Sequence, residues 1–182
     1  MTDLAIAALV VGALLALLGG IALAAPDRAR RGARAFPRSA WTGRLLTAID
    51  IAWVAVIVVR APLGRFEHLK PLVYIAAPAG YLLIVSFMDE LLAPRALGGL
   101  LLLAANPLVR SAFVHPSSLR LVMTCFAYFW VVAGMVLMLS PYRFRQAAEL
   151  TLGSDSKCRV TGAIRLLLGT IMICLALFVY RS

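Results

Sequence analysis

Six long apolar runs, separated by short polar segments, dominate the chain. They cover residues 4–25, 45–59, 71–87, 96–109, 121–139 and 160–180. A helix needs about 20 apolar residues to cross the hydrocarbon core of a bilayer, because each residue adds about 1.5 Å. The first, fifth and sixth runs reach that length alone, and the second reaches it when Trp41 and Arg60 are counted as its ends. The pattern predicts an all-α fold, a polytopic bundle of about six transmembrane helices.

Two of the runs are less regular. The third contains Pro71 and Pro78, and a proline inside a helix predicts a kink. The fourth, residues 96–109, is short and contains Asn106-Pro107. It is open to three interpretations: a tilted span, a re-entrant segment, or a helix broken near Pro107. We favour six spans, with five spans or a re-entrant fourth run as the alternative.

Positive charge collects in two polar segments, one after the first run and one after the fifth. Lys-rich and Arg-rich loops are retained on the cytoplasmic side of a membrane, so we expect both segments in the cytoplasm and both termini outside. Such arginines also suit the anionic headgroups of lipids such as cardiolipin, and topology alone explains them equally well. The candidate lipid-facing residues are Arg28, Arg30, Arg31, Arg34, Arg38, Arg44, Arg143, Arg145 and Arg159.

Composition supports a membrane protein. Apolar residues make up 63% and charged residues 14%, whereas soluble chains have about 45–50% and about 25%. This excludes a soluble enzyme. The net charge of +10 lies mostly in the loops, which membrane topology explains better than nucleic-acid binding does. We therefore expect membrane lipids as partners and no nucleic acid.

The chain also matches itself at a shift of 115 residues, which places Gly19 on Gly134, Pro26 on Pro141, Arg28 on Arg143 and Arg30 on Arg145. Each copy reads as a helix that stops at proline, a basic interfacial stretch and a second helix. Chance alignment of a biased composition is the alternative. The repeat predicts three units: an N-terminal hairpin (1–60), a central hairpin (61–117) and a C-terminal hairpin repeat (118–182).

This arrangement resembles the small two-helix bacterial inner-membrane proteins of the YjeT-like type. The segments GMVLMLSPYRFRQAAEL and CRVTGAIRLLLGTIMI carry the resemblance best, and residues 13–58 carry it more loosely. The resemblance implies a bacterial cytoplasmic membrane. It implies no site residues, because the function of that family is not established.

Small residues recur every four positions along the first run. Such a face lets two helices approach closely, and close packing drives helix association in lipid. The face either packs within this chain or docks a partner subunit. Its residues are Ala8, Gly12, Ala16, Gly20 and Ala24.

Asp50 lies well inside an apolar run, and the repeat aligns it with Arg165. A charge at that depth costs a few kcal/mol at least and normally finds a partner or marks an ion or proton path. We predict an intramembrane ion pair between Asp50 and Arg165. The alternatives are that both side chains reach water at the interface, or that Asp50 carries protons.

Catalytic and metal-binding patterns are missing from the sequence. It contains no GxSxG, HExxH or P-loop motif and no CxxC pair, and His68 and His115 lie at loop edges without partners at helical spacing. We expect no enzyme, no metal and no cofactor. The favoured function is an accessory or scaffold subunit of a larger membrane complex, with other subunits or a second copy as partner. The alternative is a small transporter or channel component with Asp50 in its pathway.

Overall fold

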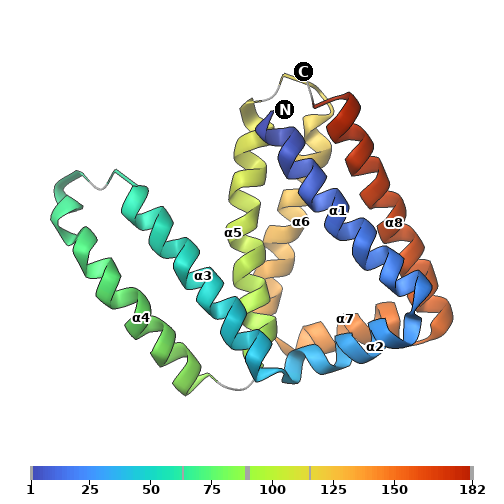
Figure 1. The fold of residues 1–182 in the computed structure, drawn as a ribbon, viewed down its shortest axis with the longest axis horizontal. Helices are drawn as coiled ribbons and strands as arrows, with labels where there is room; N and C mark the ends of the chain where they lie inside the picture. Colours follow the sequence, from blue (N-terminus) through green and yellow to red (C-terminus); the bar gives the residue numbers. More distant parts are fainter. Residues whose placement is uncertain (1, 63, 89–90, 115, 181–182) are drawn as a thin grey trace.

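The computed structural model describes residues 2–62, 64–88, 91–114 and 116–180. These residues are helical almost throughout and contain no strand, which confirms the predicted all-α fold. Figure 1 shows the elements in order: α1 (Asp3–Ala24), α2 (Pro26–Ala35), η1 (Phe36–Arg38), α3 (Ala40–Arg60), η2 (Gly64–Leu69), α4 (Lys70–Phe87), α5 (Leu92–Val114), α6 (Arg120–Leu139), α7 (Tyr142–Leu152) and α8 (Asp155–Phe178).

Six of these helices are long and apolar enough to cross a membrane: α1, α3, α4 with the end of η2, α5, α6 and α8. This is the architecture of an integral membrane protein. The fourth span, α5, has 23 residues and continues through Pro107, so the broken-helix interpretation is wrong, and the helix is long enough for a full span. The apolar run was a poor measure of this helix, because Arg95 and Arg110 lie inside its two ends and can extend toward the interfaces.

The helices form two antiparallel pairs and a separate hairpin (Figure 1). One pair is α1 with α8, the other is α5 with α6, and the α3–α4 hairpin lies against the other side of α5. Both termini lie at one end of the molecule, here called the terminal end. The surface helices α2 and α7 lie side by side at the opposite end, the basic end.

Glycines bring α1 and α8 into backbone contact. Gly12 faces Gly169 and Gly19 faces Gly162, so that the pairs recur every seven residues along both helices. A Cβ on Gly19 would lie 2.7 Å from the Gly162 carbonyl oxygen, and one on Gly12 would lie 2.9 Å from that of Gly169. A seven-residue repeat is typical of left-handed coiled-coil packing. The two helices are therefore held by close backbone approach and not by interlocking large side chains.

The predicted face of α1 only partly matches this contact. Ala8 and Gly12 are buried, and Ala16 meets the Gly169 position, but a Cβ on Gly20 would meet no atom within 4 Å, and Ala24 is exposed. Four residues advance about 400° around a helix, so a stripe at that spacing drifts by about 40° at each step. The true contact continues at Gly19 and Ala22 instead, because a heptad drifts only about half as far, about 20°, over seven residues.

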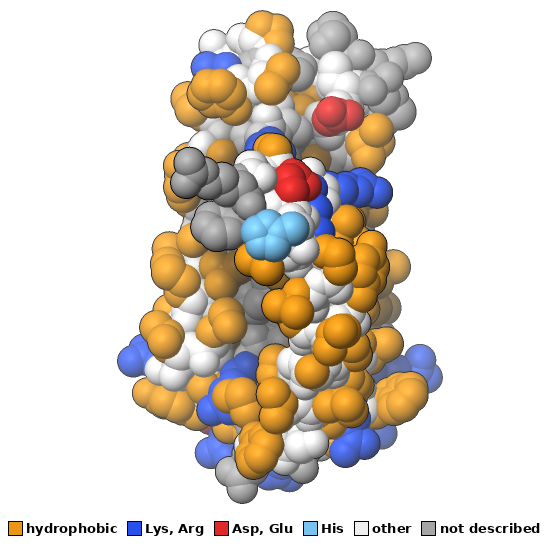
Figure 2. All heavy atoms as spheres, turned by 90° about the vertical axis from the view of Figure 1, so that its left-hand side faces the viewer, with side chains coloured by type: hydrophobic (Ala, Val, Ile, Leu, Met, Phe, Trp, Pro, Cys, Tyr) orange, Lys and Arg blue, Asp and Glu red, His pale blue; other side chains and the backbone are white. Residues whose placement is uncertain are grey.

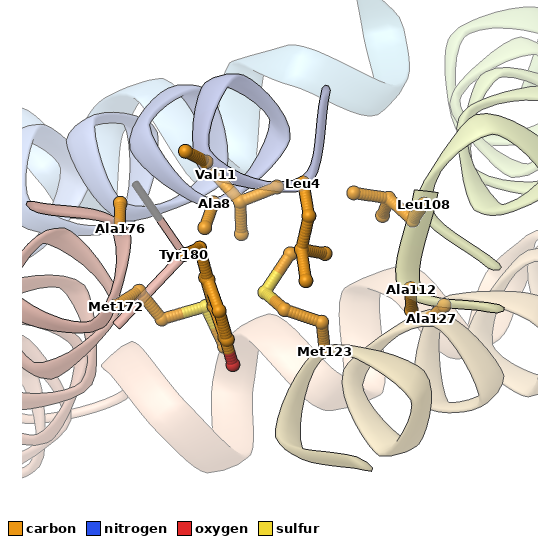
Figure 3. Close-up of a cluster of buried hydrophobic side chains, with 11 residues drawn as sticks. Leu4, Ala8, Val11, Leu108, Ala112, Met123, Ala127, Met172, Ala176 and Tyr180 are labelled. Atoms are coloured by element: carbon orange, nitrogen blue, oxygen red, sulfur yellow. The ribbon is translucent and has the colours of Figure 1, made fainter. Parts of the chain in front are cut away.

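The second pair, α5 and α6, has one such glycine contact. The two helix pairs then meet at the terminal end. Gly98 and Gly134 approach so closely that a Cβ on either would lie 2.7 Å from the carbonyl oxygen of the other. Figure 3 shows the buried cluster that joins the pairs, in which side chains of α1, α5, α6 and α8 surround Leu4, Met123 and Tyr180. The Tyr180 hydroxyl donates a hydrogen bond to the Leu119 carbonyl at 2.7 Å.

The two copies of the predicted repeat share an order of elements but not a mode of packing. Each has a span, a surface helix and a second span, and the second spans begin at matching caps: Ser39 accepts from the Thr42 amide and Ser154 from the Lys157 amide. However, α1 packs on α8, whereas α6 packs on α5. The expected units 1–60, 61–117 and 118–182 therefore do not pack as separate hairpins.

The glycine contacts predict a strong positional effect on stability. Gly19→Leu forces α1 and α8 apart, and we expect it to lower the free energy of unfolding by about 3 kcal/mol. Gly20→Leu is the matched control on the next residue, where the space is open, and we expect a change below about 0.5 kcal/mol. Unfolding of the purified protein by dodecyl sulfate measures both. Equal effects would contradict the described contact between α1 and α8.

Candidate functional sites

The basic end is built by α2 and α7. Pro26 begins α2, where its missing N–H costs no helical hydrogen bond, and α7 likewise follows Pro141. The rings of Phe36 and Phe144 lie 5.0 Å apart between centroids and join the two surface segments. This packing holds both basic segments at one end of the molecule.

The structure brings all nine predicted arginines to the basic end, but they are not equivalent. Arg30 Nη2 lies 2.6 Å from Asp27 Oδ1 and 2.5 Å from Asp155 Oδ1, so it ties α2 to the first turn of α8. The hydrogen bond to Asp27 raises the pKa of Arg30. Arg145 Nε lies 3.6 Å from Glu149 Oε1. The remaining seven have exposed side chains: Arg28, Arg31, Arg34, Arg38, Arg44, Arg143 and Arg159.

Asp50 lies where α3 crosses α5. Gly99 leaves room for the carboxylate, because a Cβ at that position would come within 2.7 Å of Asp50 Oδ2. One turn earlier, the buried Thr47 hydroxyl donates to the Gly43 carbonyl at 2.8 Å. Asp50 Oδ1 is buried and has no hydrogen-bond partner in the structure. A carboxylate in an apolar medium is stable only when it binds a proton, a cation or a hydrogen-bond donor. Among the described residues, none donates a hydrogen bond to Asp50 Oδ1.

The predicted ion pair between Asp50 and Arg165 is not formed. Asp50 is on α3, on one side of α5, and Arg165 is on α8, on the other side (Figure 1). Neither residue has a salt-bridge partner among the residues that the structure describes. The repeat indicated a common depth in the membrane, but depth does not imply adjacency when the two copies pack differently.

Arg165 instead lines a cavity that the sequence did not predict. This central cavity, of about 1930 Å³, lies between the two helix pairs, and α2 and α7 line it at the basic end. Its walls are mostly apolar and include Leu14 and Leu18 of α1 and Phe126 and Trp130 of α6. No sequence signal could have revealed it, because α1 is apolar on every face and its lipid-facing, cavity-facing and packing sides look alike.

The remaining reactive side chains are dispersed. Within the described ranges, no group of three His, Cys, Asp or Glu residues could hold a metal ion. Cys158 is buried, with its Sγ 3.6 Å from the Ala22 carbonyl oxygen, whereas Cys125 and Cys174 are exposed on their spans. His68 is exposed, and His115 lies outside the described residues.

Comparison of this chain with protein-family models, with curated proteins and with solved structures found no match. The resemblance to YjeT-like proteins therefore stays a prediction from the sequence. Because a helical fold alone does not specify an activity, function has to be argued from the sites described above.

A double-mutant cycle tests the separation of Asp50 and Arg165. We expect Asp50→Asn and Arg165→Gln to change the free energy of unfolding additively, within about 0.5 kcal/mol, because the two side chains share no contact. The free energies of unfolding of both single variants and the double variant, measured in detergent, give the coupling. A coupling of about 1.5 kcal/mol or more would restore the ion pair.

Proposed function

We propose that this protein is a non-catalytic subunit of a larger membrane complex and that its α3–α4 hairpin docks a transmembrane helix of a different polypeptide. One observation carries the proposal: α4 has no buried residue and packs mainly on α3. The share of buried residues is 33% in the most apolar stretch of α1 and 0% in that of α4. The helix α4 thus contributes little to the packing of its own chain, whereas α3 anchors the hairpin on α5.

The surface of α4 supports a protein partner in addition to lipid. Ala76 and Gly80 are one turn apart, and a Cβ on Gly80 would meet no atom within 4 Å. Elsewhere in the spans the glycines meet a neighbouring helix, apart from Gly20. Small residues favour helix association in lipid because they allow close backbone approach. Figure 2, which views the molecule from the hairpin side, shows hydrophobic side chains over this surface between more polar ends.

We place this subunit in a bacterial cytoplasmic membrane with the basic end in the cytoplasm. The bias in arginines supports the orientation, since α2 and α7 carry most of them at one interface. The same arginines support binding of anionic lipid headgroups at that interface. The family resemblance supports the bacterial membrane.

A small transporter or channel component is the second candidate, and Asp50 favours it. A buried carboxylate oxygen without a partner is typical of proton and cation paths through membranes. Against it, the other acidic residues of the described spans (Asp3, Glu67 and Asp155) stand at span ends, and no second titratable group faces Asp50 from α5 in the contacts described.

Co-purification tests the docking role. We expect Gly80→Leu to abolish stoichiometric co-purification of other polypeptides in mild detergent, because the added side chain separates α4 from its partner helix. Gly20→Leu is the matched control: its Cβ also meets open space, but on α1. Mass spectrometry of the tagged complex gives the partner chains. Recovery of the same partners with Gly80→Leu, or of a second copy of this chain alone, would contradict the proposal.

Flux measurements test the transporter alternative. In proteoliposomes with an internal pH dye, a proton path through Asp50 predicts a flux that falls at least tenfold in Asp50→Asn, because the neutral amide neither binds nor releases a proton. The proposed subunit role predicts no flux above that of empty vesicles in either protein. A flux that Asp50→Asn leaves unchanged would exclude Asp50 from the path.

A further inference from the structure

The central cavity combines apolar walls with unequal charge along its length. At the basic end it is lined by Arg28 of α2 and Arg165 of α8, and no acidic residue lines that part of it. Its acidic lining residue is Asp3, which lies at the terminal end together with Arg110. The residues that line the basic end of the cavity therefore include two arginines and no carboxylate.

Arg165 carries a partly buried charge without a partner among the described residues. It is partly buried, lies within a membrane span and has no hydrogen bond or salt bridge to any residue that the structure describes. A guanidinium is charged at all physiological pH values, and an unpaired charge is costly at this depth. Side chains on a helix point toward its N-terminus, so Arg165 is directed along α8 to the basic end, where Arg28 enters the cavity.

We propose that the central cavity holds an anionic membrane lipid, with its phosphate on Arg165 and Arg28 and its acyl chains along the walls toward Leu14, Leu18 and Trp130. The apolar walls exclude a free inorganic anion as the main occupant, because such an ion gains nothing from them. The volume of the cavity also exceeds that of typical pockets for small ligands, which is about 300–1,000 Å³. Arginine suits the phosphate group, since its planar guanidinium donates two parallel hydrogen bonds.

This site differs from the other exposed arginines of α2 and α7, because Arg28 and the partly buried Arg165 also line the apolar cavity. Arg165 is partly buried among mostly apolar walls, so a phosphate bound to it is less screened by salt than one bound to a fully exposed arginine. The proposal does not depend on the role as a complex subunit, because the two arginines of the cavity lie on α2 and α8, whereas the proposed docking surface lies on α4. Either can fail without the other.

Quenching of tryptophan fluorescence by brominated lipids tests the site. Trp130 lines the cavity, and it is the single remaining tryptophan in a variant with Trp41→Phe and Trp53→Phe. In phosphatidylcholine vesicles we expect brominated phosphatidylglycerol to quench Trp130 at a low mole fraction. Its apparent affinity should be about tenfold higher than that of brominated phosphatidylcholine, as expected for a charge-assisted contact.

Two further substitutions locate the origin of that preference. We expect Arg165→Gln to abolish it, whereas Arg159→Gln keeps it, because Arg159 is exposed on the same helix and does not line the cavity. Equal loss in both variants would assign the preference to surface charge and overturn the proposal. Equal quenching by both lipids in the parent protein, or no quenching of Trp130, would overturn it even if Arg165→Gln does not fold.

Discussion

The close approach of the α1 and α8 backbones is the contact on which the rest of the bundle depends. In lipid, burying apolar side chains brings little gain, because the surroundings are as apolar as the side chains themselves. Gly12, Gly19, Gly162 and Gly169 remove the side chains that would keep the helices apart. Dispersion contacts between the two helices then replace the hydrophobic effect as the source of stability.

This pair also determines the shape of the space beside it. Because α1 and α8 are packed tightly on each other, together they form one side of the central cavity. The helices α5 and α6, in contact through Gly98 and Gly134, form the other side. The two sides meet at Tyr180 and the buried cluster of the terminal end, and they diverge toward α2 and α7 (Figures 1 and 3). Divergence leaves the central cavity open where the chain is most basic. The packing of small residues thus indirectly positions Arg165.

Much of the fold could be predicted from the sequence, because spans depend on length and hydrophobicity and interfaces depend on charge. The apolar runs predicted the six spans, and prolines 26 and 141 marked where surface helices begin. The partners of each helix could not be predicted. Periodicity identifies a buried face only when the opposite face is polar, and α1 is apolar all round, so a four-residue stripe and a heptad looked equally plausible.

The candidate sites show the same limit. The nine arginines could be assigned to one end because the spacing of the spans determines it. The pairing of Asp50 with Arg165 failed because it assumed that similar sequences pack in similar ways. The orphaned oxygen of Asp50 and the cavity both arise from three-dimensional contacts between helices far apart in the chain, and no local pattern reports such contacts.

The contact between α1 and α8 has a consequence for biosynthesis. Thr2 donates a hydrogen bond to the carbonyl of Tyr180, and α1 packs on α8 although the segment from α2 to α7 separates the two helices in the chain. During translation α1 must therefore wait, with its glycines unpartnered, until α8 has been made. The nascent chain thus forms its most extensive helix contact only after α2 to α7 have been synthesised.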